Sequence, residues 1–421
     1  MSVKLSKILD EIGIKAKAAS AILNTASSDQ KNKFFDFAVK AIQENADLIL
    51  EANKIDIKEA RTNKKDEAFI DRLALDKARL QGLCDTLAEI KSFQDPVGRV
   101  IASWDRPNGL NISRVSTPLG VIGLIFESRP NVAADAGGLC LKSGNAVILR
   151  SGKDGLRSAT AIVNSLQGAL KQSELPKESI QIVPTESREA ATKMLEGLNG
   201  SIDVIVPRGG KSLVAEVEKS AKIPVFGHLE GICHIYVDEH ADQEKALSVC
   251  LNAKMRRTGI CGAVETILVN QNIASSFIPR LIDKLDDEGC EIRGCNNILK
   301  IDSRVVPASE EDWSTEYLAP IVSVKSVPSI NEAIDHIRNF GTGHTESIIS
   351  ENKDKQLSFT DSIDSAIVMI NTSTQFADGG EFGLGGEIGI ATGKFHARGP
   401  VGINQLTSFK YIVRGDGHIR A

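Results

Sequence analysis

Residues 119–152 read LGVIGLIFESRPNVAADAGGLCLKSGNAVILRSG, and this stretch decides the fold. Two short apolar runs, residues 119–126 and 145–150, flank a window from Asn131 in which apolar residues recur at helical spacing. A strand, a helix and a second strand in this order are typical of a parallel βαβ unit, because a parallel pair needs a crossover connection. The stretch therefore predicts an α/β fold with a doubly wound parallel sheet.

The alternation of strands and helices continues toward the C-terminus in two series, whereas residues 1 to about 95 show helical periodicity throughout. The first series adds a helix over 156–170 and strands over 179–183 and 202–206. The second series predicts a separate α/β domain with helices over 243–254, 275–285 and 330–337. Its predicted strands are ICHIYV (232–237), VETILV (264–269), NILKI (297–301), PIVSVKSV (320–327), ESIIS (346–350) and AIVMI (366–370).

Residues 99–115 predict a projecting β-hairpin. Two extended runs are joined there by Asp105-Arg-Pro-Asn-Gly109, whose Asn-Gly pair is a strong turn signal. The run TSFKYIV (407–413) predicts a last strand. Exposed strand edges and apolar faces are liabilities in a monomer, so we expect a homo-oligomer.

The composition excludes several classes of protein. The 421 residues carry 50 Lys and Arg against 55 Asp and Glu, a net charge of −5, which argues against nucleic acid as a partner. The most apolar run, residues 119–126, is far shorter than the roughly 20 residues that cross a bilayer, so we expect no membrane span. Charges at Lys4, Lys7, Asp10 and Glu11 interrupt any secretory signal. We expect a cytoplasmic protein whose seven cysteines are free thiols.

Two glycine-containing turns are candidate phosphate sites, although neither the Rossmann GxGxxG nor the P-loop pattern follows a predicted strand. Pro207-Arg-Gly-Gly-Lys-Ser212 lies between the strand at 202–206 and a helix, so its backbone amides could hold a phosphate. An ordinary tight turn is the alternative. A similar turn, Arg150-Ser-Gly-Lys-Asp-Gly155, contributes two cations, Arg150 and Lys153, that would suit the 2′-phosphate of NADP.

Cys261 is the candidate nucleophile. It lies in Met255-Arg-Arg-Thr-Gly-Ile-Cys-Gly262, between flanking glycines and near Arg256 and Arg257, which could favour the thiolate. A buried structural thiol remains the alternative. Cys140 and Cys233 occupy apolar positions typical of buried side chains, and the spacing of Cys290 and Cys295 indicates no metal site.

Four motifs together resemble the gamma-glutamyl phosphate reductases, also called glutamate-5-semialdehyde dehydrogenases, a family in the aldehyde dehydrogenase superfamily. The resemblance covers essentially the whole chain. The motifs are residues 116–152, Gly259-Ile-Cys261, Glu316-Tyr-Leu-Ala-Pro320, and FGLGGEIGIATGKFHARGPVGINQLTSFKYI at 382–412.

The resemblance implies an aldehyde dehydrogenase-like fold with three parts. Residues 1–97 and 118–222, with part of 376–404, would form a Rossmann-like NADPH-binding domain. Residues 223–375 would form the catalytic domain that contains Cys261, and residues 98–117 and 405–421 a small β oligomerisation element.

The resemblance also implies roles for single residues. Cys261 would be the nucleophile. The groups that bind NADPH would be Arg150, Lys153, Pro207, Gly209, Gly210, Glu316 and Leu318. The usual side-chain oxyanion donor would fall at Ser128, which leaves the donor unassigned, with backbone amides near Cys261 or Asn131 to be considered. The hydrolytic base is also missing, since only His228 or Glu230 falls near its place.

The function implied by the resemblance is NADPH-dependent reduction of L-glutamyl 5-phosphate to L-glutamate 5-semialdehyde through a Cys261 thioester, the second step of proline biosynthesis from glutamate. Functional association with glutamate 5-kinase would follow. The substrate's phosphate and carboxylate need polar and cationic partners; the candidates are Arg129, Asn131, Arg256, Arg257, His396 and Arg398. The alternatives are an NAD-dependent aldehyde dehydrogenase, a cofactor-free cysteine acyltransferase or hydrolase, and a non-catalytic assembly protein.

Overall fold

The computed structural model describes residues 3–420, which divide into two compact units. Unit 1 comprises the described residues up to Gly227, the segment Gly383–Gly389 and the residues from Pro400 onward. Unit 2 comprises His228–Phe382 and Ile390–Gly399. The finer division into three parts, with a separate oligomerisation element, stays a prediction.

Unit 1 is built on a four-stranded parallel sheet in the order β5-β4-β3-β6. The chain moves outward from β3 through β4 to β5 and then returns to β6 on the other side of β3. The strand order therefore reverses between β3 and β6, as expected for a doubly wound sheet. The strands are β3 (Val121–Phe126), β4 (Ala146–Ser151), β5 (Ile180–Ile182) and β6 (Val204–Arg208).

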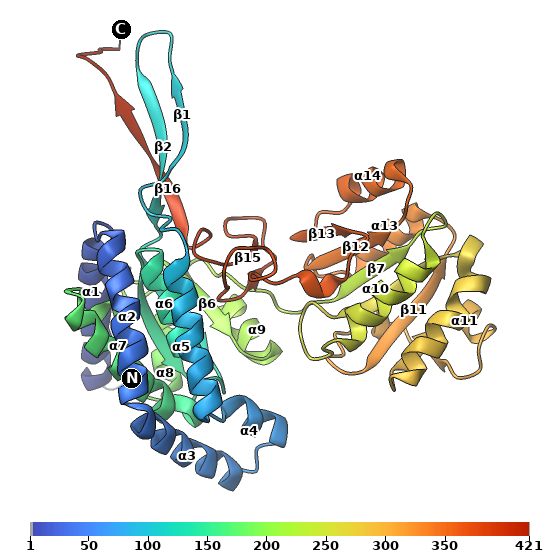
Figure 1. The fold of residues 1–421 in the computed structure, drawn as a ribbon, viewed down its shortest axis with the longest axis horizontal. Coiled ribbons are helices and arrows are strands. Elements are labelled where there is room, and N and C mark those ends of the chain that lie inside the picture. The colour runs from blue at the N-terminus through green and yellow to red at the C-terminus, as the bar shows by residue number, and fades with distance from the viewer. Residues whose placement is uncertain (1–2, 421) are drawn as a thin grey trace. The chain divides into compact units, whose positions relative to one another are not determined.

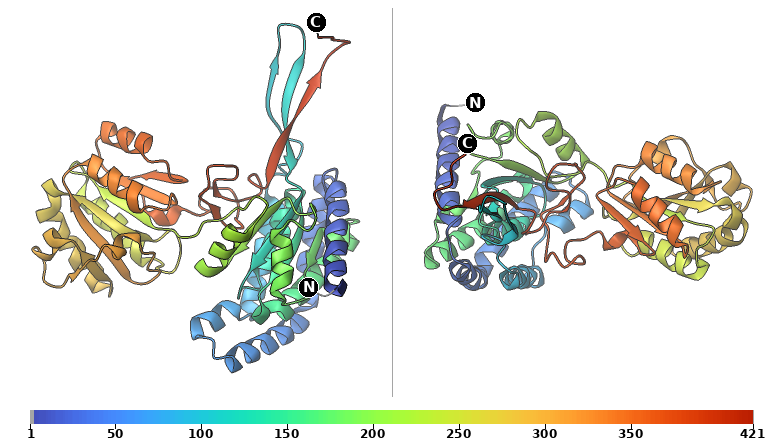
Figure 2. Two further views of the ribbon diagram at one scale, coloured as in Figure 1. Left: turned by 180° about the vertical axis from the view of Figure 1, so that it is seen from behind. Right: turned by 90° about the horizontal axis from the view of Figure 1, so that it is seen from above.

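Helices cover both faces of this sheet (Figure 2). The right-handed connections place α6 and α7 on one face and α8, which returns the chain to β6, on the other. The N-terminal helices add a further layer, since α2 and α5 pack on α7 and α6, while α1 contacts β4 and α8. The helices are α1 (Val3–Leu23), α2 (Ser28–Glu44), α3 (Ala46–Thr62), α4 (Glu67–Leu73), α5 (Lys77–Ser92), α6 (Val132–Lys142), η1 (Lys153–Gly155), α7 (Leu156–Gln172), η2 (Lys177–Ser179), α8 (Arg188–Leu195) and α9 (Lys211–Ser220).

The sequence fixes where several of these helices begin. Ser27 and Gln30 form a capping box at the start of α2, in which each side chain accepts a hydrogen bond from the other residue's backbone N–H. The side chains of Asp66 and Asp76 cap α4 and α5 in the same position relative to their helices.

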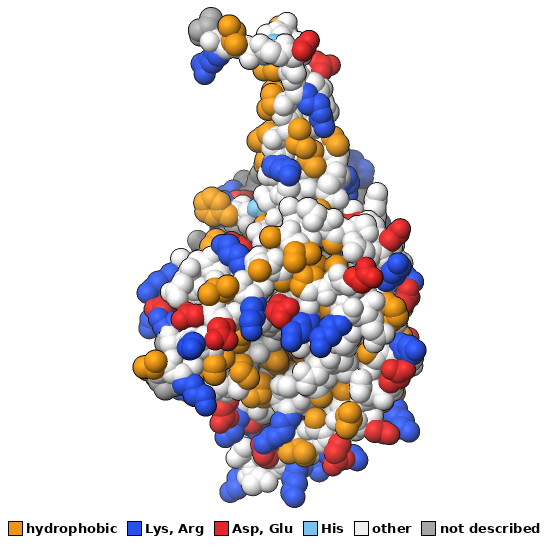
Figure 3. Space-filling model, turned by 90° about the vertical axis from the view of Figure 1, so that its left-hand side faces the viewer, with side chains coloured by type: hydrophobic (Ala, Val, Ile, Leu, Met, Phe, Trp, Pro, Cys, Tyr) orange, Lys and Arg blue, Asp and Glu red, His pale blue; other side chains and the backbone are white. Residues whose placement is uncertain are grey.

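A three-stranded antiparallel sheet, β1-β2-β16, projects from unit 1 (Figure 1). Its strands are β1 (Val100–Asp105), β2 (Asn111–Pro118) and β16 (Thr407–Arg414). The predicted hairpin is confirmed, and Gly109 has the positive φ of 89° that its turn requires. Apolar side chains gather on this projecting sheet (Figure 3). Trp104 and Tyr411 contact each other there, and Tyr411 is 56% exposed.

Unit 2 contains a seven-stranded parallel sheet in the order β10-β9-β11-β8-β7-β12-β13. The strand order reverses between β7 and β12. Helices α10 and α11 pack in one apolar cluster, and α13 and α14 in another. The strands are β7 (Cys233–Val237), β8 (Val264–Asn270), β9 (Glu291–Gly294), β10 (Val306–Pro307), β11 (Ile321–Val327), β12 (Thr345–Ile349) and β13 (Ile367–Ile370).

The remaining elements of the chain are short connections and the helices of unit 2. They are α10 (Gln243–Met255), α11 (Gln271–Asp287), α12 (Asn296–Leu299), η3 (Glu311–Ser314), α13 (Ile330–Phe340), α14 (Lys353–Ser362), η4 (Thr374–Phe376), β14 (Ile390–Ala391) and β15 (Gly399–Pro400). Within residues 3–420, none of the helices combines the length and apolarity needed to cross a membrane.

One predicted strand is wrong. The run NILKI at 297–301 overlaps the short helix α12, and the strand at this point of the chain is instead β9, which ends at Gly294. Ile298 is fully buried, which explains the apolar signal. An apolar run of this length does not distinguish a strand from a buried helical turn, because burial alone produces it. The predicted α/β fold is otherwise confirmed.

Candidate active site

Cys261 and three further titratable side chains lie at the amino edge of the sheet of unit 2. Cys261 precedes β8, and His228, Glu316 and His344 precede β7, β11 and β12. These four strands are neighbours and run parallel, so the segments that enter them meet at one edge.

The turn that contains Cys261 is held by contacts with the segment after β13. The amide of Gln375 donates to the carbonyl of Ala253 at 2.8 Å and to that of Arg257 at 3.2 Å. Gly262 packs against the same segment, since a Cβ on residue 262 would lie 3.2 Å from the carbonyl oxygen of Thr374. The turn is therefore fixed at both its ends.

Cys261 differs from most of the other cysteines in its exposure. Cys261 and Cys295 are half-exposed, whereas the other five are buried: Cys84, Cys140, Cys233, Cys250 and Cys290. Burial raises the pKa of the Cys140 and Cys233 thiols, which keeps them protonated at neutral pH. The prediction that Cys140 and Cys233 are buried is confirmed.

The backbone of Gly231 lies directly against Cys261. A Cβ on residue 231 would lie 2.3 Å from the Cys261 carbonyl oxygen and 2.8 Å from the Cys261 Cβ, so glycine alone fits. The Gly231 N–H donates to Glu316 Oε1 at 2.9 Å. One carboxylate oxygen of Glu316 is thus committed to the backbone beside the thiol.

Two histidine rings lie beside Cys261. One ligand atom each of His228, Cys261 and His344 lies within 4.8 Å of the others. The Nδ1 atom of His228 is 2.7 Å from the carbonyl oxygen of Ile390. His344 is fully buried, and burial together with the His228 ring lowers its pKa to about 3, so that its imidazole is neutral at pH 7.

The loop that contains Glu316 and Leu318 rests on a buried ion pair. Leu318 has a positive φ of 51°, and its N–H donates to Glu265 Oε1 at 3.4 Å. The other Glu265 oxygen accepts from Lys254 Nζ at 2.5 Å, and both side chains are fully buried. Burial raises the pKa of Glu265 to about 7.

Four of the proposed substrate-binding side chains belong to unit 2. Arg256 and Arg257 are exposed at the end of α10, and Arg256 Nη1 lies 3.4 Å from the Gln375 side-chain oxygen. His396 is exposed. Arg398 is ion-paired with Asp364 at 2.8 Å. Hydrogen bonds from Lys394 and then Arg398 lower the pKa of Asp364 to about 2.

The proposed phosphate turn of unit 1 lies at the carboxyl edge of its sheet, where the strand order reverses between β3 and β6. Ligands of doubly wound sheets bind at such points. The pairing of β6 with β3 ends at Arg208, the residue after Pro207, and a Cβ on Gly209 would lie 2.9 Å from a Glu127 carboxylate oxygen. Gly210 is the N-cap of α9 and provides no side-chain cap, and backbone amides at such a helix start can hold an anion.

Arg150 and Lys153 line one cavity of about 580 Å³ at the same carboxyl edge. Arg150 is 9% exposed, its Nη2 donates to the Glu186 carbonyl at 3.1 Å, and its Nε is buried without a hydrogen-bond partner among the described residues. Lys153 Nζ lies 3.9 Å from Glu186 Oε2. The lining residues are Lys65, Phe69, Glu127, Ser128, Arg150, Gly152, Lys153, Asp154, Glu186 and Arg188.

The remaining proposed groups, Arg129 and Asn131, follow β3. Arg129 is exposed. The amide of Asn131 donates to Asp135 Oδ2 at 2.9 Å. Burial raises the pKa of Asp135 to about 6. Ser128, at the expected place of the superfamily's oxyanion donor, has a positive φ of 45°.

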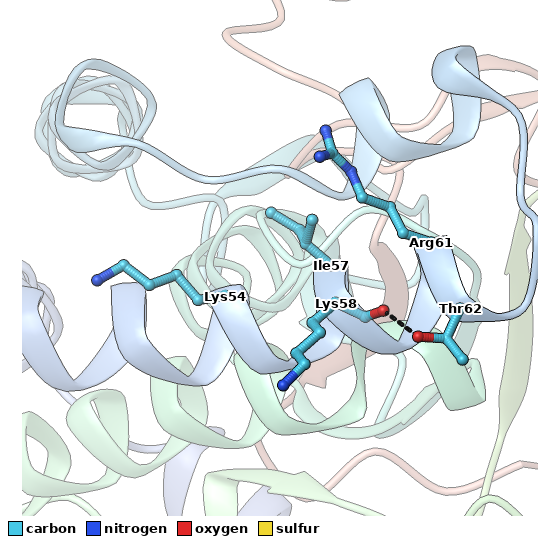
Figure 4. A pocket seen from close by; sticks show the side chains of 5 residues that line it. All are labelled: Lys54, Ile57, Lys58, Arg61 and Thr62. Carbon is cyan, nitrogen blue, oxygen red and sulfur yellow. Dashed lines mark hydrogen bonds between the residues drawn. The ribbon is translucent and has the colours of Figure 1, made fainter.

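A further cavity of about 550 Å³ lies on α3, away from these groups in the chain (Figure 4). Lys54, Ile57, Lys58, Arg61 and Thr62 line it, and the Thr62 hydroxyl donates to the Lys58 carbonyl. Its lining contains no nucleophile or carboxylate, so it offers no chemistry comparable with that around Cys261.

Several residues of the site escaped the sequence analysis. Gly231 and His344 stand far from Cys261 in the chain, and Lys65 and Arg188 come from other segments than Arg150. A signal for His344 does exist, since it lies two residues before the predicted strand at 346–350, much as Cys261 lies three residues before the one at 264–269. Its partners become visible only when the strand order is known.

The chain matches the model of the aldehyde dehydrogenase family over residues 7–288 and 304–412. It is 55% identical over 420 residues to a gamma-glutamyl phosphate reductase of Brucella suis and covers 100% of both chains. A second relative of that name, from Parvibaculum lavamentivorans, is 53% identical over 99% of this chain and 98% of its own. The crystal structure of gamma-glutamyl phosphate reductase from Thermotoga maritima superposes with a TM-score of 0.96 at 43% identity, covering 98% of this chain and 100% of that one. The chain therefore belongs to the gamma-glutamyl phosphate reductases of the aldehyde dehydrogenase family.

Proposed function

We propose that this protein is an oxidoreductase that reduces L-glutamyl 5-phosphate to L-glutamate 5-semialdehyde and phosphate with NADPH, the second step of proline biosynthesis from glutamate. The observation that carries the proposal is the half-exposed Cys261 thiol in a fixed glycine-flanked turn. The chain that contains it matches a gamma-glutamyl phosphate reductase over its whole length. Reduction of an acyl phosphate needs such a nucleophile.

The thiolate of Cys261 attacks the acyl carbonyl carbon, and phosphate leaves with the electron pair of the broken C–O bond. A thioester on Cys261 results. Arg256 and Arg257 lie within five residues of the thiol in the sequence, and a cation close to a thiol favours the thiolate. The proton of the thiol passes to solvent before the attack.

The carboxyl edge of unit 1 fits NADPH. Its cavity brings four cationic side chains together, and Arg150 Nε, which has no hydrogen-bond partner within residues 3–420, is a buried donor that a phosphate or ribose oxygen would satisfy. When bound, NADPH supplies the hydride that releases the acyl group as an aldehyde. Arg150 and Lys153 would hold the adenosine ribose and its 2′-phosphate, the turn Pro207 to Gly210 the pyrophosphate, and Glu316 with Leu318 the nicotinamide ribose.

The substrate's anionic groups would be held by Arg129, Asn131, Arg256, Arg257, His396 and Arg398. For Arg398 this means sharing the guanidinium with Asp364. A bidentate guanidinium suits phosphate and carboxylate alike.

The reverse reaction tests the proposal, because phosphate is then a substrate. NADPH formation from glutamate 5-semialdehyde and NADP⁺ should require phosphate as the acyl acceptor, since no residue is assigned to hydrolysis of the thioester. Phosphate-free oxidation at a comparable rate, with free glutamate as product, would instead indicate a hydrolytic aldehyde dehydrogenase. Equal turnover with NAD⁺ would contradict the cofactor assignment.

We further propose a cytoplasmic homo-oligomer that associates functionally with glutamate 5-kinase. The projecting sheet β1-β2-β16 supports the oligomer, because it exposes the apolar side chains of Val100, Trp104 and Tyr411. Sedimentation of the full chain as a monomer at micromolar concentration would exclude it.

A further inference from the structure

Three side chains with metal-binding chemistry converge at the amino edge of unit 2. His228, Cys261 and His344 come from three different segments, and one ligand atom of each lies within 4.8 Å of the others. The two imidazole rings are 4.8 Å apart between centroids, at an interplanar angle of 74°. Two imidazoles and a thiol are the ligand types that Zn²⁺ and related soft cations prefer.

The hydrogen bonds of His228 orient it as a ligand. Its Nδ1 lies 2.7 Å from the Ile390 carbonyl oxygen, which accepts only, so that Nδ1 must donate. This tautomer puts the ring's lone pair on Nε2. A histidine that ligates a metal through one nitrogen commonly donates its other N–H to a backbone carbonyl, which fixes the ring.

His344 provides the second, independent observation. It is fully buried, and its Nδ1 lies 2.9 Å from Thr345 Oγ1. Its Nε2 is buried without a hydrogen-bond partner among the described residues. An unsatisfied buried polar atom costs about 1–3 kcal/mol. A cation bound at His344 Nε2 would remove this cost.

We infer that Cys261, His228 and His344 form a binding site for one soft divalent cation, Zn²⁺ or Cd²⁺, that reversibly masks the thiol. The thiol proton goes to solvent, and the thiolate and two neutral imidazoles each donate one electron pair to the cation. A water molecule completes the tetrahedron. The masking rests on the proposed function of Cys261, whereas the binding does not.

The geometry requires only small shifts. A tetrahedral zinc with Zn–S of about 2.3 Å and Zn–N of about 2.0–2.1 Å places its ligand atoms about 3.3–3.6 Å apart. The largest separation between ligand atoms in the cluster is within 4.8 Å, so side-chain rotations that shift these atoms by about 1 Å close the site. Ca²⁺ and Mg²⁺ are disfavoured because the cluster offers no oxygen ligand.

A cobalt titration tests the inference. Co²⁺ added to the full-length protein in metal-free buffer should bind once per chain and give the near-ultraviolet band of a thiolate–cobalt bond. The band should vanish in Cys261→Ser. His228→Asn and His344→Asn should each weaken Co²⁺ binding by at least about 100-fold, because even partners outside the ligand shell are worth about 10- to 100-fold in affinity.

The chain offers a matched control in Asp238, Glu239 and His240, a second group with metal-ligand spacing. Asp238 already accepts from the Tyr236 hydroxyl at 3.0 Å and from Ser350 Oγ at 2.9 Å. His240→Asn should therefore leave the thiolate–cobalt band unchanged. If the buried His344→Asn does not fold, the half-exposed His228 carries the test.

The outcomes separate this inference from the proposed function. A wild-type protein without the thiolate band, or an affinity unchanged in the folded histidine variants, overturns the cation site. If Cys261→Ser is inactive in that case, the proposed function is kept although the cation site is lost. A band that needs Cys261 and the histidines supports the site, and inhibition of turnover by Zn²⁺ that a chelator reverses supports the masking. A Cys261→Ser variant that still turns over would overturn the masking.

Discussion

In unit 1 the groups proposed to hold the cofactor lie at the carboxyl edge of a parallel sheet, whereas in unit 2 the half-exposed thiol lies at the amino edge. The corresponding carboxyl edge of unit 2 is occupied by polar groups that satisfy one another. Asp238, which follows β7, accepts from Tyr236 and Ser350, and these hydrogen bonds contribute to the lowered pKa of its carboxyl.

This difference shows which functional groups can be located from the strand order alone. The rule that ligands bind where the strand order reverses points to the groups of unit 1 that are proposed to hold the cofactor. It does not find Cys261, because the groups around the thiol precede their strands. The amino edge of unit 2 is instead identified by the chemistry of its side chains and by the backbone contact of Gly231 with Cys261.

The largest expected effect is that of Cys261→Ala at the amino edge. Loss of a covalent nucleophile removes the reaction path itself, so turnover in either direction should fall by at least about 10⁴-fold with the fold retained. Cys295→Ala, at the other half-exposed cysteine, is the control and should keep its activity. Steady-state rates and circular dichroism measure both. An active Cys261→Ala variant would show that Cys261 is not the nucleophile.

At the carboxyl edge, Arg150→Ala with Lys153→Glu should narrow the preference for NADP⁺ over NAD⁺. Two charge-assisted contacts to a phosphate, each worth about 1.5–3 kcal/mol, correspond to about 100-fold or more in the ratio of kcat/KM values. Lys58→Glu, in the cavity on α3, makes the same charge change as Lys153→Glu outside the site and should leave the ratio unchanged. A double variant with the wild-type ratio would remove these residues from the cofactor site.

The buried carboxyl of Asp135, beside Asn131, should make the free energy of unfolding depend on pH. Burial raises its pKa from 3.8 to about 6, so the folded state holds the proton more tightly than the unfolded state. Stability should therefore fall as the pH rises from about 4 to about 6, by about 3 kcal/mol for a shift of about two units. Asp135→Asn should raise the free energy of unfolding in urea at pH 8 and leave it unchanged near pH 4. An equal effect at both pH values would contradict the assigned cause.

The smallest expected effect is that of Gly231→Ala at the amino edge. The added Cβ would clash with the Cys261 backbone and should destabilise the protein by about 1–3 kcal/mol while displacing the thiol. Gly259→Ala is the matched control, since its Cβ would meet only the Leu318 carbonyl at 3.9 Å. Urea unfolding and kcat compare the two variants. Equal effects would show that Gly231 has no special relation to Cys261.

The sequence predicted most strands and helices of both units because their apolar periodicity and flanking glycines are local signals. The prediction of a strand at 297–301 is wrong because Ile298 is buried in a helical turn, which produces the same apolar pattern. Cys261 was recognisable from its glycine-flanked turn and from family resemblance. Its contacts with Gly231 and its closeness to His344 were not, because they arise from the order of β7, β8 and β12 in the sheet.

The acyl-enzyme itself is the most direct measure of the account. Rapid mixing of the protein with glutamate 5-semialdehyde and NADP⁺ in the absence of phosphate should give a burst of one NADPH per active site and then stop. A peptide that contains Cys261 should carry the glutamyl group, and added phosphate should restart turnover. Continued NADPH formation without phosphate, or an unmodified Cys261 after the burst, would contradict the account.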